Sequence, residues 1–200
     1  MKKIMLLLTI ASGWWLKADC QSVSGTEMYY YMSNRSLSIS SQLWYESAKG
    51  WYTEARYNYE AAKTISLYSG KTFGNESAFS YTVTPLAGVV AGQYNGGALA
   101  CNGTVDYTKW SFSLQSQYTF SIQDKMENFI YSWAEIGYQV SGGFAAGVSL
   151  QQTKLYQAKS TTAQGLFIRG QYGRWQLPLY LFNIQQNDRQ IVLGLTYTSW

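Results

Sequence analysis

Residues 189–200, RQIVLGLTYTSW, decide the fold that we expect for this chain. Side chains of an extended chain alternate between its two faces with a period of two. One face then carries Ile191, Leu193, Leu195 and Tyr197, and the other carries Gln190, Val192, Gly194, Thr196 and Thr198. Trp200 departs from this alternation, which would place the aromatic residue at position 199. We therefore predict a strand with one strongly apolar face at the end of the chain.

The composition suits strands that have one apolar face and one polar, uncharged face. Hydrophobic residues make up 46% of the 200 residues and aromatic residues 17%, with 18 tyrosines, whereas charged residues make up only 13%. That charged fraction is about half of the value in ordinary globular proteins. Strands rich in aromatic and small polar residues are typical of transmembrane β-barrels. A mean hydropathy of −0.20 argues against a bundle of membrane helices.

The closing segment resembles the last strand of Gram-negative outer-membrane β-barrels, through Gly194, Leu195, Tyr197 and Trp200. The resemblance is to this porin-like class and not to one family. It implies that the segment is the assembly signal read by the barrel-insertion machinery. It also implies that the protein lies in the cell outer membrane, in contact with the membrane lipid.

Residues 1–20 have the pattern of a secretory signal peptide. Two lysines precede an apolar run over residues 4–16, which is too short to span a membrane as a helix. Cleavage is expected after Ala18 or after Cys20. The second site would leave Gln21 as the first residue of the mature chain.

Two features of the composition exclude classes of function. The chain contains no histidine, which removes histidine-dependent catalysis and histidine metal ligands, so we expect no enzyme, no cofactor and no metal site. The net charge of the whole chain is +4. Without residues 1–20, 12 basic and 10 acidic residues remain, and the basic residues form no stripe. Nucleic acid is therefore not an expected partner. Removal of Cys20 would leave Cys101 without a disulfide partner, and we interpret Cys101 as a small apolar side chain on a strand.

The rest of the chain reads as a closed antiparallel transmembrane β-barrel over residues 37–200. Residues 21–36 are expected to be a periplasmic segment that leads into the barrel, or an extra short strand. From residue 37 we expect about twelve strands, with ten as the alternative, because outer-membrane barrels have even strand numbers. The expected strands cover residues 37–47, 51–60, 64–70, 77–84, 86–94, 98–107, 109–121, 129–140, 144–157, 164–172, 175–184 and 189–200.

The connections between these strands alternate between tight and longer, as they do in outer-membrane barrels with short periplasmic turns. The alternation is clear from the C-terminus backward and weakens in the first half, where Lys49-Gly50 and Asn95-Gly96 would be very short external loops. Pro85 is expected in a turn between two strands, where its missing N–H does no harm. Pro178 lies inside an expected strand and predicts a bulge or a missing ladder bond.

The face opposite the apolar one would line the interior of the barrel. It carries charged residues of both signs, namely Glu46, Glu54, Arg56, Glu60, Asp106, Glu135 and Arg169. These side chains either pair and fill a narrow interior or line a weakly selective pore. Trp51, Trp110 and Trp175, near strand ends, are expected to form aromatic girdles at the membrane–water interfaces.

Three functions remain open at this point. The first is a narrow, porin-like passive channel for small solutes or ions. The second is a closed barrel with a structural, adhesive or partner-binding role. The third is a secreted soluble β-barrel or lectin-like domain, whose apolar faces would point inward. The scarcity of charge on the polar faces favours a membrane barrel, because soluble sheets normally place charged residues on their outer face.

Overall fold

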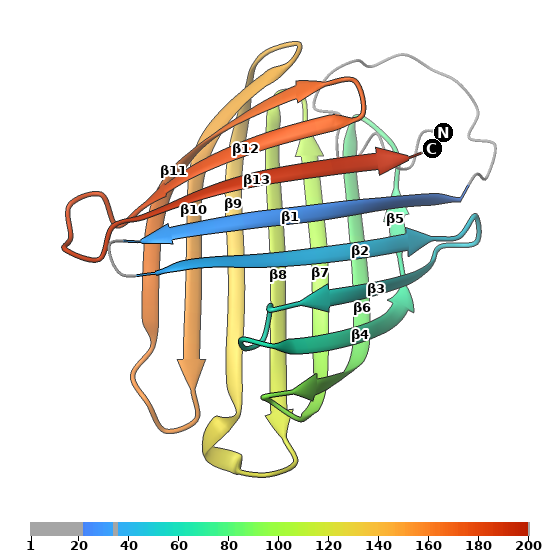
Figure 1. Cartoon of the computed structure of the whole chain (residues 1–200). Helices are drawn as coiled ribbons and strands as arrows, with labels where there is room; N and C mark the ends of the chain where they lie inside the picture. The colour runs from blue at the N-terminus through green and yellow to red at the C-terminus, as the bar shows by residue number, and fades with distance from the viewer. Residues whose placement is uncertain (1–21, 34–35, 200) are drawn as a thin grey trace.

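The computed structural model describes residues 22–33 and 36–199, which form one antiparallel sheet closed into a barrel (Figure 1). The strands are β1 (Val23–Ser33), β2 (Leu37–Glu46), β3 (Trp51–Tyr57), β4 (Thr64–Lys71), β5 (Phe73–Asn75), β6 (Phe79–Gly92), β7 (Gly96–Tyr107), β8 (Trp110–Ser121), β9 (Phe129–Ser141), β10 (Phe144–Leu155), β11 (Thr161–Tyr172), β12 (Trp175–Phe182) and β13 (Gln190–Ser199). A short 3-10 turn, η1 (Lys125–Glu127), lies between β8 and β9. The predicted signal peptide and Trp200 lie outside the described residues.

The described residues form a ring of twelve strand positions. β4 and β5 pair with the same neighbour, β6, and are interrupted only at Thr72, so together they occupy one of these positions. The pairing of β1 with β13 closes the ring, with Tyr29 opposite Gly194. The predicted class, a closed antiparallel barrel of about twelve strands, is confirmed. A closed sheet leaves no unpaired edge, which is the condition for a sheet in lipid.

The barrel begins at Val23 and not at residue 37. β1 is a full strand that pairs with β13 on one side and with β2 on the other. Of the two expectations for residues 21–36, the structure therefore supports a strand for residues 23–33, longer than the short one expected. The alternation is masked in the sequence because β1 carries aromatic rings on both faces, with Tyr29 and Tyr31 on one and Tyr30 on the other.

The expectation that Pro85 lies in a turn was wrong. The two expected strands around it are a single strand, β6, in which Pro85 lies opposite Cys101 of β7. On its other side, the pairing of β6 stops at Leu86 with β4 and resumes at Val83 with β5. The missing N–H of Pro85 thus falls beside an interruption of the ladder, where a proline costs little. The expected number of strands, about twelve, is still correct, because β1 is an additional strand and the strands expected at 77–84 and 86–94 are one strand.

Pro178 interrupts the ladder without a bulge. The pairing of β12 with β13 runs through Gln176 and Thr196, skips Leu177 and Pro178, and resumes at Leu179 and Leu193 in the same register. The prediction of a missing ladder bond is confirmed, and the alternative of a bulge is not. The residue opposite the proline is Gly194, where a Cβ would lie 2.5 Å from Pro178 Cγ and 2.8 Å from Tyr29 Cε1.

The connections differ in length between the two ends of the barrel. We call the end that holds Val23 and Ser199 the terminal end and the opposite end the loop end (Figure 1). The terminal end has tight turns at residues 108–109, 142–143 and 173–174, and the loop end has longer connections, at 58–63, 122–128, 156–160 and 183–189. The exception at the loop end is the connection over residues 93–95, which is short, as expected for Asn95-Gly96. Because β1 precedes it, the turn at Lys49-Gly50 lies at the terminal end and is not a short external loop.

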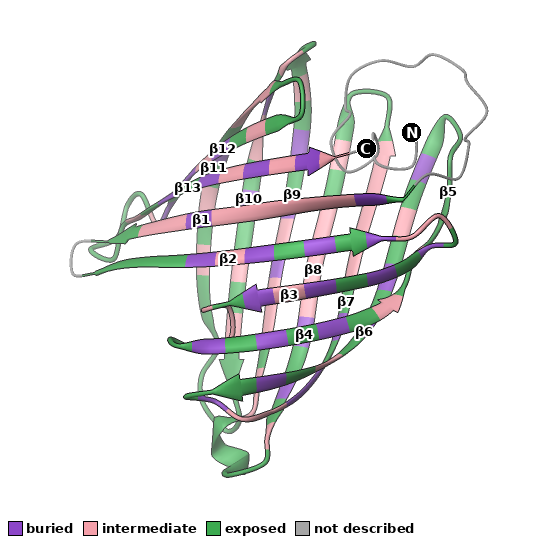
Figure 2. Ribbon diagram, turned by 45° about the vertical axis from the view of Figure 1, so that its right-hand side comes forward, coloured by how far each residue is buried: buried purple, intermediate pink, exposed green. Residues whose placement is uncertain are grey.

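The apolar side chains of the barrel face outward. Buried and exposed residues alternate along the strands (Figure 2), and on β13 Val192 is 0% exposed whereas its neighbour Leu193 is 41% exposed. Leu43, Val89 and Leu99 are among the most exposed apolar residues of the outer face. A soluble barrel would bury these side chains, so the exterior suits lipid and argues against the secreted soluble alternative. Among the described residues, no helix has the length and apolar character needed to cross a membrane.

Candidate functional site in the barrel interior

The barrel encloses a cavity of about 470 Å³ in the half nearer the terminal end. Its wall includes Glu46 of β2, Asp106 of β7 and Thr198 of β13, which all lie near the terminal end of their strands. The volume is in the range of small-molecule binding sites. We call this space the vestibule.

The seven charged residues expected in the interior fall into two groups. Glu46, Asp106, Glu135 and Arg169 line the vestibule. Glu54, Arg56 and Glu60 are outside its wall, and their side chains form a packed ionic cluster. Arg169 forms an ion pair with Glu135, and its guanidinium lies 4.8 Å from the ring centroid of Phe167. Both groups mix acids and a base, as the alternation of the sequence indicated.

Arg56 is the centre of the ionic cluster. It forms an ion pair with Glu54, and its Nη1 lies 3.8 Å from Glu60 Oε1. The same Nη1 donates a 2.6 Å hydrogen bond to Gln117 Oε1 on β8, and the guanidinium lies 4.4 Å from the ring centroid of Tyr68. β3 and β8 are not neighbours in the sheet, so this hydrogen bond crosses part of the interior.

Glu60 reaches the cluster from a loop and not from a strand. β3 ends at Tyr57, and Asn58 adopts a positive φ of 57°, so Glu60 lies in the connection to β4. Its carboxylate accepts hydrogen bonds of 2.8 Å from Ser66 Oγ and Tyr68 Oη. The expected strand over residues 51–60 was therefore too long by three residues, although the carboxylate of Glu60 still points inward.

An aromatic bridge of Tyr29, Trp133 and Tyr180 crosses the barrel beside the vestibule. The ring centroids of Tyr29 and Trp133 are 5.4 Å apart, and those of Trp133 and Tyr180 are 5.1 Å apart. Tyr29 is on β1 and Trp133 on β9, with β10, β11, β12 and β13 between them on one side of the ring. Trp133 Nε1 donates a 2.7 Å hydrogen bond to Ser149 Oγ, which fixes the indole. The bridge narrows the interior.

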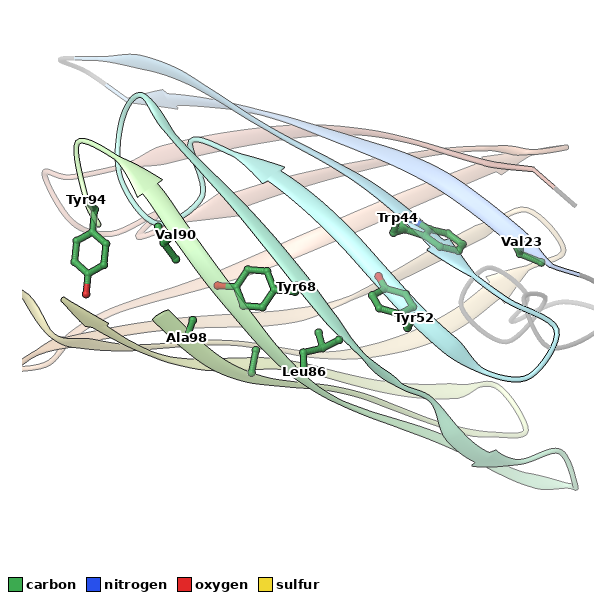
Figure 3. Packing of buried hydrophobic residues seen from close by; sticks show 9 residues of the cluster. Val23, Trp44, Tyr52, Tyr68, Leu86, Val90, Tyr94 and Ala98 are labelled. Carbon is green, nitrogen blue, oxygen red and sulfur yellow. The ribbon is translucent and has the colours of Figure 1, made fainter. Parts of the chain in front are cut away.

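Buried apolar side chains also line the interior from the terminal end to the loop end. One buried cluster runs along the inner wall from Val23 through Trp44, Tyr52 and Tyr68 to Tyr94 (Figure 3). Tyr94 lies in the connection between β6 and β7, and its ring centroid is 5.9 Å from that of Phe129. Burial raises the pKa of Tyr94 to about 12.

Sequence reasoning missed Glu27, which lines the vestibule from β1. Tyr29 Oη lies 3.5 Å from Glu27 Oε2. Glu27 was missed because residues 21–36 were not assigned firmly to a strand. The alternation of Glu27, Tyr29 and Tyr31 with Met28 and Met32 was the signal that could have found it.

The three tryptophans expected at membrane boundaries lie on the outer face at the terminal end. Trp51, Trp110 and Trp175 are the first residues of β3, β8 and β12, and all three are exposed. The ring centroid of Trp110 is 5.0 Å from that of Tyr138, and that of Trp175 is 4.8 Å from that of Tyr197. These three residues mark one ring of aromatic side chains and not two.

No protein-family model and no curated protein matches this chain. Its structure is similar to that of the KdgM porin, with a TM-score of 0.63 and 14% sequence identity over 88% of this chain and 99% of that chain. The KdgM porin in complex with disordered oligogalacturonate gives a TM-score of 0.64, also at 14% identity and with the same coverage. The NanC porin gives a TM-score of 0.56 at 9% identity over 88% of this chain and 98% of that chain. The chain therefore has the fold of these porins.

Proposed function

We propose that this protein is a narrow, porin-like passive channel for small solutes or ions in the cell outer membrane. The observation that carries the proposal is the vestibule, a cavity of about 470 Å³ lined by charged, polar and aromatic side chains inside a closed barrel whose outer face is apolar. A barrel of this kind excludes lipid from its interior and leaves the interior to water and solutes. We propose no catalytic role for its residues.

The arrangement of the two ends supports an orientation. Outer-membrane barrels place short turns and both termini in the periplasm. The terminal end, with its tight turns, would then face the periplasm, and the vestibule would open on that side. Trp51, Trp110 and Trp175 would lie at the inner membrane–water boundary, and β13, with Gly194, Leu195 and Tyr197, would be the strand read by the insertion machinery.

The path from the vestibule to the loop end passes two groups of side chains. One is the aromatic bridge, and the other is the ionic cluster around Arg56 with its hydrogen bond to Gln117. Their rings and side chains set the width of the path. This narrowing is the reason why we propose small solutes or ions and not large ones.

We do not propose oligogalacturonate, which the KdgM porin binds in its complex, as a solute of this channel. Oligogalacturonate is a polyanion, whereas the vestibule wall of this protein carries more carboxylates than guanidinium groups. Like charges that face each other across a narrow space repel.

The same narrowing favours a second candidate function, a closed barrel with a structural or partner-binding role. The contact between Tyr29 and Trp133 and the hydrogen bond between Arg56 and Gln117 both cross the interior. If these contacts persist in the membrane, solutes would not pass. The protein would then act through its exterior or its loops.

Conductance in a planar lipid bilayer separates the two candidates. Detergent-refolded residues 21–200 should insert and give discrete conductance steps. Trp133→Ala removes from the aromatic bridge the indole that contacts Tyr29 and Tyr180, and it should raise the conductance of each step. Trp110→Ala, the same substitution on the outer face, should leave it unchanged. Silent bilayers with both the unchanged chain and Trp133→Ala, from protein that is folded in detergent, would reject the channel in favour of the closed barrel.

A further inference from the structure

The charges on the vestibule wall are strongly unequal in number. Among the described residues, its wall holds five carboxylates and one guanidinium, that of Arg169. The carboxylates belong to Glu27, Glu46, Glu76, Asp106 and Glu135. They come from β1, β2, β7, β9 and the connection between β5 and β6, so they surround the space. Several charges of one sign that face a narrow cavity attract ions of the opposite sign.

The cationic side chains of the interior already have acidic partners. Arg169 forms an ion pair with Glu135, and Arg56 forms one with Glu54. Within each pair, the positive and the negative charge offset each other. Glu27, Glu76 and Asp106 add carboxylates to the wall for which the described residues supply no ion pair, so an excess of carboxylates faces any solute that enters.

The wall also presents buried oxygen acceptors without donors. Gln42 is 3% exposed, and its Oε1 has no hydrogen-bond partner among the described residues, although its Nε2 donates to Glu54 Oε2 at 2.9 Å. Asn102 Oδ1 and Asp106 Oδ2 are likewise buried and without a partner in the described part of the chain. All three residues line the vestibule. Buried acceptors are normally satisfied, so these oxygens suit a ligand that brings N–H donors.

Aromatic rings complete the wall. Trp44 and Tyr52 line the vestibule and stack with ring centroids 6.1 Å apart and an interplanar angle of 15°. Trp133 and Tyr180 of the aromatic bridge line it as well. The faces of such rings attract organic cations. A bound metal ion fits less well, because no group of three or more metal-ligating side chains converges within the described ranges.

We propose that the vestibule binds small organic cations with ammonium groups, and that the channel prefers cations over anions. The second half of this statement rests on the proposed channel function, whereas the binding does not. Carboxylates would supply charge, the unpartnered oxygens would accept hydrogen bonds from N–H groups, and the rings would cover the carbon chain. A cavity of about 470 Å³ is large enough for such a molecule.

Binding is tested on detergent-refolded residues 21–200 with three five-carbon probes, namely 1,5-diaminopentane, 1,5-pentanediol and glutarate. These probes share a chain length and differ in charge. Trp44 and Trp133 line the vestibule, so binding should change tryptophan fluorescence. The diamine should bind at least about tenfold more tightly than the diol, which corresponds to roughly 1.4 kcal/mol, and glutarate should bind least. Equal binding of the three probes, or tighter binding of glutarate, would overturn the proposal.

Charge-neutral variants locate the effect in the vestibule. The combination of Glu27→Gln, Glu46→Gln and Asp106→Asn should lower the affinity for the diamine by about tenfold and keep side-chain size. Asp188→Asn, in the loop between β12 and β13, is the matched control and should leave the affinity unchanged. An unchanged affinity in the folded triple variant would contradict the assignment. If the triple variant does not fold, the comparison of the three probes on the unchanged chain still decides.

Reversal potentials in a KCl gradient test the preference for cations. The unchanged chain should be selective for potassium over chloride, and the triple variant should lose most of this selectivity. Conductance without cation selectivity would overturn the proposed preference and leave the channel function intact. Binding of the diamine by a chain that does not conduct would reject the channel and support the binding site.

Discussion

At the scale of single residues, the buried charges of the interior are held by a few specific contacts. Arg56 contacts two carboxylates, those of Glu54 and Glu60, and both of these side chains are 0% exposed. Without Arg56, these two buried carboxylates would lower the free energy of unfolding, because burial disfavours an unpaired charge. The cluster is therefore as much a structural element as a part of the pore wall.

We expect Arg56→Ala to destabilise the barrel by about 3–5 kcal/mol, because it leaves buried carboxylates without a counter-ion. The midpoint of urea unfolding in detergent, followed by tryptophan fluorescence, measures this loss. Adding Glu54→Gln to Arg56→Ala should recover part of it, since one of the buried charges is removed. An Arg56→Ala midpoint equal to that of the unchanged protein would show that the cluster does not stabilise the barrel.

Gly194 has a steric role that can be tested against a glycine on the outer face. A Cβ at Gly194 would meet Pro178 and Tyr29 at 2.5 Å and 2.8 Å, whereas a Cβ at Gly170 would meet nothing within 4 Å. Gly194→Val should therefore destabilise the barrel by about 1–3 kcal/mol through overpacking. Gly170→Val should be tolerated. The shift between folded and unfolded bands on unheated gels reports the difference, and equal folding of the two variants would argue against the packing of Gly194.

The sequence was sufficient to place six of the seven charged residues by the alternation of side chains, with Glu60 in a loop, but not to predict their contacts. Arg56 and Gln117 are 61 positions apart and meet across the interior. Such contacts depend on the stagger of all the strands between them, which the period of one strand does not contain. Glu27 was missed for a local reason, because Tyr29, Tyr30 and Tyr31 place rings on both faces of β1.

At the scale of the strand, the outer face of β11 offers a direct test of burial in lipid. Leu166 lies in the middle of β11 and Tyr172 at its terminal end, and both side chains face outward. A lipid-facing arginine costs about 2–4 kcal/mol at the middle of the bilayer and about 0–1 kcal/mol near its boundary.

Leu166→Arg should therefore destabilise the protein in lipid vesicles by about 2–4 kcal/mol, and Tyr172→Arg by less than about 1 kcal/mol. Guanidinium unfolding from vesicles measures both values. The two variants carry the same change on the same face of one strand, so each is the control for the other. Equal losses at the two positions would mean that depth in a bilayer does not set the cost.

The errors at this scale came from Pro85 and from the aromatic rings on both faces of β1. A proline between two apolar runs predicts a turn, but Pro85 lies within β6 beside the interruption between β4 and β5. Nothing in the sequence of β6 reveals a gap in its neighbour. For Pro178 the local rule was sufficient, because the loss of an N–H is a property of the residue itself.

At the scale of the whole molecule, the closed barrel and its apolar exterior follow from the alternation and from the composition. The division of the interior into a vestibule and a filled half does not follow from them. Tyr29 and Trp133 lie on strands that four others separate along the shorter way around the ring, and their contact results from the shape of the closed barrel. The width of the path is thus a property of the whole assembly.

The central claim is that the polar face surrounds an aqueous interior while the apolar face meets lipid. β7 offers a direct test, because Cys101 is exposed on its outer face and Thr104 lines the vestibule. In lipid vesicles with a membrane-impermeant maleimide on both sides, the native Cys101 should react only after unfolding. Thr104→Cys combined with Cys101→Ala should react in the folded protein. Rapid labelling of Cys101 together with protection of Thr104→Cys would contradict the account, because it would place water on the apolar face.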